Sequence, residues 1–100
     1  MSANSETRQL AGELAEGTVS LPKHLHARPA GEVSQAAARY PEVTIELAVG
    51  GRLANARSVL AVMGLGAVTG TDVRVRASGS GAATAVDEIC RILAAPEVDR

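Results

Sequence analysis

The stretch VTIELAVGGRLAN, residues 43–55, decides the fold that this sequence predicts. Its first seven residues alternate between large apolar side chains and polar or small ones, which is the pattern of a β-strand with one buried face. Gly50 and Gly51 can adopt the positive φ angles of a two-residue hairpin turn, so residues 52–55 are expected to return as a short antiparallel strand. The residues expected to face the core are Val43, Ile45, Leu47 and Val49, with Thr44, Glu46 and Ala48 on the opposite face.

Two further strands and three helices are expected around this hairpin. Val19 and Leu21 alternate with polar residues ahead of Pro22, and residues 72–78 alternate apolar residues with arginine. This order, β-α-β-β-α-β-α, predicts a two-layer α/β (α+β) fold in which helices cover one face of a largely antiparallel, four-stranded sheet. The helices are expected at residues 27–39, which Tyr40-Pro41 ends, at residues 58–63, which Ser58 can cap, and at residues 82–94.

The chain is expected to form one small domain over residues 17–95. Residues 1–16 are interpreted as an N-terminal extension that is flexible or partly helical, because Leu10 and Leu14 lie one helical turn apart in an otherwise polar segment. Residues 96–100 are interpreted as a short tail.

The composition excludes several classes of function. Ten basic residues against eleven acidic ones argue against a cationic nucleic-acid binder, and Tyr40 as the only aromatic residue argues against a surface that stacks bases. The single Cys90 can form neither an internal disulfide nor a multi-cysteine metal site. The chain has no apolar run long enough for a signal peptide or a membrane span. We therefore expect a cytoplasmic protein that neither inserts into a membrane nor binds nucleic acid.

The segment KHLHARPAG, residues 23–31, contains both histidines and is the candidate site. His26 is expected where a loop enters a helix, since Pro29 is tolerated only in a first helical turn. The free N–H groups of such a turn, including that of Ala27, bind anions, and a neutral imidazole offers one nucleophilic nitrogen. Arg28 adds a planar cation that matches phosphate oxygens, so the combination indicates phosphoryl chemistry.

Other interpretations of this segment remain open from the residues alone. His26 could serve only as a helix cap, with Arg28 as a solvated charge. A small phosphatase could use the same two residues, but no general acid is evident beside them. His24 and His26 would hold a metal only weakly without further ligands, so neither a metal nor a cofactor is expected.

The residues His26-Ala27-Arg28-Pro29-Ala30, placed after a first strand, resemble the active-site motif of the histidine-containing phosphocarrier protein (HPr) family of the bacterial phosphoenolpyruvate:sugar phosphotransferase system. The segment NARSVLAVMGLGA, residues 55–67, resembles the regulatory-serine segment of that family, and residues 70–73 and 77–79 follow its pattern. The similarity covers about residues 17–95 in order. It implies an open-faced β-sandwich of four antiparallel strands and three helices.

The resemblance also implies a function. His26 would be phosphorylated on Nδ1 by phospho-enzyme I and would pass the phosphoryl group to the IIA component of sugar permeases. Arg28 and the backbone N–H of Ala27 would stabilise the phosphate. Such a protein is a stoichiometric carrier rather than an enzyme, and we expect it to be a monomer.

Two further roles are implied by the same resemblance. Ser58 corresponds to the serine that an HPr kinase/phosphorylase modifies, although a plain helix N-cap explains a serine there equally well. A transcription regulator is a further candidate partner of the phosphorylated form. Val62 and Leu65 are assigned to the core. The residues expected to dock enzyme I and IIA are Leu25, Val59, Leu60 and Met63.

This sequence departs from the family pattern at His24, where glycine is common, and places Gly31 and Glu32 on the helix face that usually meets acidic partners. Two alternatives to the sugar carrier remain. One is a paralogous carrier that serves nitrogen regulation or a dihydroxyacetone kinase. The other is a regulatory module switched by phosphorylation at Ser58.

Overall fold

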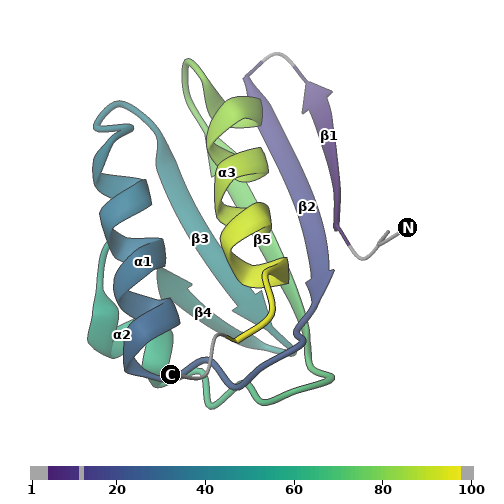
Figure 1. The fold of residues 1–100 in the computed structure, drawn as a ribbon. Helices are drawn as coiled ribbons and strands as arrows, with labels where there is room; N and C mark the ends of the chain where they lie inside the picture. Colours follow the sequence, from purple (N-terminus) through teal and green to yellow (C-terminus); the bar gives the residue numbers. More distant parts are fainter. Residues whose placement is uncertain (1–4, 12, 98–100) are drawn as a thin grey trace.

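The computed structural model describes residues 5–11 and 13–97. A sheet of antiparallel strands forms one layer, and helices lie across one of its faces (Figure 1). The elements in chain order are β1 (Ser5–Ala11), β2 (Leu14–Ser20), α1 (Ala27–Ala38), β3 (Thr44–Val49), β4 (Arg52–Asn55), α2 (Val59–Met63), β5 (Asp72–Ser78) and α3 (Ala82–Ala94).

The strands are arranged in the order β1-β2-β5-β3-β4, and every neighbouring pair is antiparallel. The central strand β5 pairs with β2 on one side and β3 on the other, so that Val75 lies opposite both Gly17 and Leu47. From β2 onward, four strands and three helices follow the order β-α-β-β-α-β-α. The predicted open-faced, two-layer architecture is therefore confirmed.

The N-terminal extension differs from the prediction. Residues 5–11 form a fifth strand instead of a helical or flexible segment, with Ser5 opposite Val19 and Ala11 opposite Leu14. The strand β2 likewise begins at Leu14 rather than near Thr18. Both differences have one cause. Backbone hydrogen bonds to neighbouring strands define these strands, whereas the prediction depends on a local alternation of apolar and polar side chains. The expectations for residues 1–4 and 98–100 lie outside the described residues.

The alternation in β3 predicts its buried face with two exceptions, one of which is Val49, expected in the core but only partly buried. Ile45 and Leu47 are fully buried as expected, and Gly50 has the positive φ angle that the turn requires. Ala48 was expected on the exposed face but is buried. It lies opposite Leu53 of β4 and Arg74 of β5, and these larger neighbours shield a side chain of one carbon.

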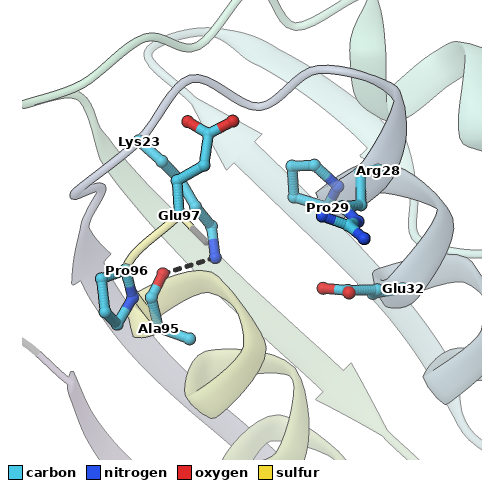
Figure 2. A pocket seen from close by; sticks show the side chains of 7 residues that line it. All are labelled: Lys23, Arg28, Pro29, Glu32, Ala95, Pro96 and Glu97. Carbon is cyan, nitrogen blue, oxygen red and sulfur yellow. Dashed lines mark hydrogen bonds between the residues drawn. The ribbon is translucent and has the colours of Figure 1, made fainter. Parts of the chain in front are cut away.

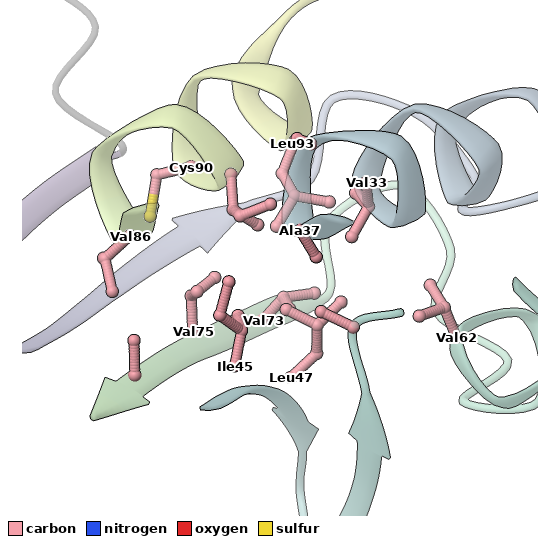
Figure 3. Packing of buried hydrophobic residues seen from close by; sticks show 14 of the residues in the cluster. Val33, Ala37, Ile45, Leu47, Val62, Val73, Val75, Val86, Cys90 and Leu93 are labelled. Atoms are coloured by element: carbon pink, nitrogen blue, oxygen red, sulfur yellow. The ribbon is translucent and has the colours of Figure 1, made fainter. Parts of the chain in front are cut away.

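The core lies between the sheet and the helices (Figure 3). Small side chains account for much of it: alanine supplies many of the fully buried positions of α1 and α3, which allows the helices to approach the sheet closely. The larger buried residues come from both layers. They are Val19, Leu21, Ile45, Leu47, Val73 and Val75 from the sheet side, and Val33, Val62, Val86, Ile89, Cys90 and Leu93 from the helices.

Truncation of the large core residues tests this packing. We expect Leu47→Ala, Ile89→Ala and Ile45→Ala each to lower the free energy of unfolding by about 2–5 kcal/mol, because neighbouring alanines leave little side chain to fill the cavity. Urea denaturation followed by circular dichroism measures the change. Leu53→Ala is the control, since Leu53 is 62% exposed, and its effect should stay below about 0.5 kcal/mol. Equal losses in the control and the core variants would contradict the assignment of the core.

Candidate functional site

The loop between β2 and α1 carries the candidate site, and backbone hydrogen bonds hold it against the loop that precedes β5. The N–H of Leu21 donates to the carbonyl of Thr71 at 2.9 Å, and that of Gly70 donates to the carbonyl of Leu21 at 2.8 Å. Farther along, the N–H of Leu25 donates to the carbonyl of Ala67 at 3.0 Å. The entry of the chain into α1 is therefore fixed by contacts far away in the sequence.

His26 occupies the N-cap position of α1. Its backbone is extended, with φ −95° and ψ −161°, and its carbonyl accepts the first helical hydrogen bond, from Ala30, at 3.0 Å. The N–H groups of Ala27 and Arg28 precede that bond and have no partner within the helix, while Pro29 has no N–H to satisfy. The His26 side chain makes no capping hydrogen bond. The imidazole is therefore not used as a cap, and the two N–H groups beside it have no hydrogen-bond partner in the described part of the chain.

The His26 imidazole contacts a carboxylate from the other end of the chain. Its Nε2 lies 2.8 Å from Oε2 of Glu97, and the side chain is 47% exposed. Because a carboxylate can only accept, a hydrogen bond here requires the proton on Nε2, and in the neutral ring Nδ1 then carries the lone pair. Among residues 13–97, no side chain or backbone group forms a hydrogen bond with Nδ1. Nδ1 is therefore the ring nitrogen that this half-exposed side chain leaves without a hydrogen-bond partner among those residues.

A hollow of about 340 Å³ lies beside the first turn of α1 (Figure 2). Arg28 and Glu32 reach it from the helix, one turn apart, while Lys23 and Glu97 face them from the opposite side. No ion pair to Arg28 occurs among the described residues, so its guanidinium is available to an incoming anion. The full lining is Lys23, Arg28, Pro29, Glu32, Ala95, Pro96 and Glu97.

Lys23 is the only lysine of the chain and is 5% exposed. Its Nζ donates to the carbonyls of Ile92, at 2.7 Å, and Ala95, at 2.6 Å, both at the C-terminal end of α3. The last turn of a helix leaves carbonyls without helical partners, which a cation satisfies well. Burial lowers the pKa of Lys23 below its usual value of 10.5, although the negative charges of Glu32 and Glu97 oppose that shift.

His24 is hydrogen-bonded to the loop that precedes β5, and among the described residues no hydrogen bond joins it to His26. Its Nδ1 accepts a hydrogen bond from the backbone N–H of Thr69 at 3.1 Å, and the Thr69 hydroxyl lies 3.3 Å from the same nitrogen. Within the described part of the chain, no group of three or more His, Cys, Asp or Glu side chains could hold a metal ion. None of the described helices is long and apolar enough to cross a membrane.

Ser58 and three of the four predicted docking residues lie at or on α2, which packs beside α1. The Ser58 side chain accepts a hydrogen bond from the backbone N–H of Ala61 at 3.1 Å, so the unmodified hydroxyl caps the helix. Leu60 is 80% exposed and Met63 is also exposed, whereas Val59 is half-buried against the core.

The predicted docking role of Leu25 is wrong. It was expected on the docking surface but is 3% exposed and belongs to the core cluster. Alternation along the loop buries every second residue, so Leu25 points inward between two exposed histidines, His24 and His26. A buried side chain offers no surface to a partner. Val62 and Leu65 are buried, as predicted.

Sequence reasoning missed Lys23 and Glu97. Glu97 is separated from His26 by 71 positions in the chain, and no local pattern connects them. A signal for Lys23 was present, since it falls in phase with the apolar residues Leu21 and Leu25, two positions from each. A lysine in that phase is expected to point inward and therefore to need acceptors for its amine.

Residues 15–95 match the model of the protein family described as PTS HPr component, phosphorylation site. Solved structures also resemble the chain. The phosphocarrier protein HPr from Bacillus anthracis is 26% identical, with a TM-score of 0.75 over 82% of this chain and 99% of that one. The HPr-C-His structure from Thermoanaerobacter tengcongensis is 28% identical, with a TM-score of 0.72 over 78% of this chain and 89% of that one.

The catabolite repression containing protein Crh of Bacillus subtilis is also similar, at 26% identity and a TM-score of 0.65, over 86% of this chain and 87% of that one. That structure is described as a dimer formed by domain swapping. The relatives named here thus include both phosphocarriers and a protein associated with catabolite repression.

The lowered pKa of Lys23 predicts how stability changes with pH. Between the folded-state pKa and 10.5, the unfolded chain binds a proton at Lys23 that the folded protein does not, so stability rises with pH in this window. We expect the free energy of unfolding of the unmodified protein, minus that of Lys23→Met, to increase as the pH rises toward 10.5. Urea denaturation at several alkaline pH values measures this difference, in which all other titrating groups cancel. A difference that decreases with pH would mean that the folded state stabilises the charged amine.

Proposed function

Because the chain belongs to the HPr family of phosphotransferase-system components, we propose that it relays a phosphoryl group through His26, from phospho-enzyme I to the IIA component of sugar permeases. In this role it is a cytoplasmic, stoichiometric carrier and not an enzyme that turns over a substrate by itself. One phosphoryl group enters and the same group leaves.

The observation that carries the proposal is the position of the His26 Nδ1. This nitrogen is at the N-terminus of α1, on a half-exposed side chain, and the contact of Nε2 with Glu97 leaves it unprotonated in the neutral ring. A carrier that receives its phosphoryl group from one protein and gives it to another needs such an open nucleophile. A deep pocket would obstruct both transfers.

The transfer requires a simple exchange of bonds. The Nδ1 lone pair of His26 attacks the phosphorus of the donor's phosphohistidine, and a new N–P bond forms. The bond from phosphorus to the donor nitrogen breaks, and the electron pair returns to the donor ring. The reverse exchange with an acceptor histidine completes the relay.

The first turn of α1 supplies the stabilisation that this transfer needs. Phosphoryl transfer proceeds through a loose transition state, in which charge on the equatorial oxygens must be held in position. The free N–H groups of Ala27 and Arg28 point toward the N-terminal end of the helix, where anions bind. The Arg28 guanidinium, which forms no ion pair among residues 13–97, can hold two phosphate oxygens.

The exposed apolar side chains of α2 are the proposed docking surface for both partners. Leu60 and Met63 are exposed on a short helix next to α1, and half-buried Val59 of the same helix packs against the core. A phosphate on Ser58, at the start of this helix, would place about −1.5 to −2 charges beside that apolar surface. Modification of Ser58 by an HPr kinase/phosphorylase would therefore weaken docking.

A labelling experiment tests the phosphocarrier function. We expect the protein to acquire acid-labile phosphate when it is incubated with labelled phosphoenolpyruvate, Mg²⁺ and enzyme I, and we expect His26→Ala to abolish the label. His24→Ala is the matched control and should retain it, because His24 contacts Thr69 and not the phosphorylated ring. Label that persists in His26→Ala would refute the proposal.

Two further outcomes of this experiment point to other functions. Acid-stable label that depends on ATP and disappears in Ser58→Ala would support a regulatory module. Consumption of phosphoenolpyruvate without enzyme I would indicate an enzyme.

Replacement of Leu60 tests the docking surface. We expect Leu60→Ser to lower the second-order rate constant of phosphoryl transfer from enzyme I by about 5- to 30-fold, with stability unchanged, since a central apolar contact contributes about 1–2 kcal/mol to an interface. Leu53→Ser, at a leucine that is 62% exposed on the edge strand β4, is the control and should transfer at the normal rate. If both variants lose rate equally, α2 is not the docking surface.

A further inference from the structure

We propose that Glu97 and Lys23 are positioning residues for His26. Glu97 holds the imidazole in the tautomer that leaves Nδ1 free, and Lys23 holds the segment that carries Glu97. This inference rests on the proposed function, because it concerns the same histidine, and it assigns roles to two residues from opposite ends of the domain.

The contact between Glu97 and His26 selects one tautomer. The two atoms, Oε2 of Glu97 and Nε2 of His26, are 2.8 Å apart, which is the distance of a charge-assisted hydrogen bond. A carboxylate accepts from Nε2–H but has no proton to donate to an unprotonated Nε2. The tautomer with its proton on Nδ1, which cannot attack phosphorus through Nδ1, therefore loses this contact.

Glu97 is placed by the buried lysine. The Nζ of Lys23 binds the carbonyls of Ile92 and Ala95 at 2.7 and 2.6 Å, and only Pro96 separates Ala95 from Glu97. The ring of Pro96 fixes its φ angle, so the direction of the chain after Ala95 is restricted. Figure 2 shows the Lys23 amine at the Ala95 carbonyl, with Glu97 on the same side of the hollow. Lys23 lies only three residues before His26, so one loop carries both the histidine and the anchor for its partner.

The same contact remains useful after the phosphoryl group has moved. When neutral His26 attacks through Nδ1, the ring keeps its proton on Nε2 and becomes a cation, while the donor nitrogen takes the electron pair of the broken bond. The Glu97 carboxylate then faces a positive ring. Its contact therefore strengthens as the N–P bond forms, which favours phosphorylation at Nδ1.

Nitrogen NMR of the full-length, unphosphorylated protein tests the tautomer directly. In the neutral ring, we expect His26 to carry its proton on Nε2 alone. Glu97→Gln, which keeps the size of the side chain but can serve either tautomer, should produce a mixture, and so should Glu97→Ala. Glu42→Ala is the matched control, because Glu42 is an exposed acid beyond the opposite end of α1 and should leave the tautomer unchanged.

The lysine is tested by the same signal. Lys23→Met removes both hydrogen bonds to α3 and should give the mixture of tautomers expected for Glu97→Ala. Lys23→Arg restores a cationic donor and should recover the single tautomer. Circular dichroism identifies a variant that has lost its fold. An effect of Lys23→Met that Lys23→Arg does not reverse would overturn the role given to Lys23.

The rate of phosphoryl transfer completes the test. We expect Glu97→Gln and Glu97→Ala to accept phosphate from enzyme I about two- to fivefold more slowly than the unmodified protein, the size of effect typical of one exposed charged contact. An unchanged tautomer together with an unchanged rate in both variants would overturn the inference and leave the proposed function intact. Failure of the unmodified protein to accept phosphate would overturn both.

Discussion

The candidate site depends on the loop between β2 and α1, which is held from two directions. Backbone hydrogen bonds join Leu21 and Leu25 to the loop before β5, and the Lys23 amine joins the same loop to the end of α3. Side chains along this loop alternate, so the inward-pointing residues anchor it while the histidines remain outside. A rigid support of this kind lets an exposed nucleophile keep a fixed position without being enclosed.

The rest of the molecule needs few large side chains. The core is built largely from alanine and valine in a chain with a single aromatic residue, and it suffices because one layer of helices covers only one face of the sheet. Tyr40 is placed at the far end of α1, where its hydroxyl donates to Glu88 at 2.6 Å and its carbonyl accepts from Arg57 at 2.5 Å. The helix is thus tied to α3 and to the start of α2 at the end opposite His26, which leaves its N-terminus unobstructed.

Local patterns in the sequence predict most of this fold. The strict alternation of residues 43–49 and 72–78, and the breakers around the helices, set element bounds within a residue or two of those observed. The strand β1 could not be found in this way, because it is defined by pairing with β2 and not by its own residues. The residues of the candidate site likewise differ in whether local sequence predicts them. His26, Ala27 and Arg28 are neighbours in the chain and form a recognisable motif, whereas the contacts of Lys23 and Glu97 join segments about 70 residues apart.

The identity of the buried cation has a chemical consequence. Lys23 is the only lysine among ten basic residues, and its amine is shielded and engaged with two carbonyls. Every basic side chain on the described surface is therefore an arginine or a histidine, and acylation of lysine, which removes positive charge from many proteins, has almost nothing to act on here. The guanidinium of Arg28, beside His26, is thus not subject to this form of modification.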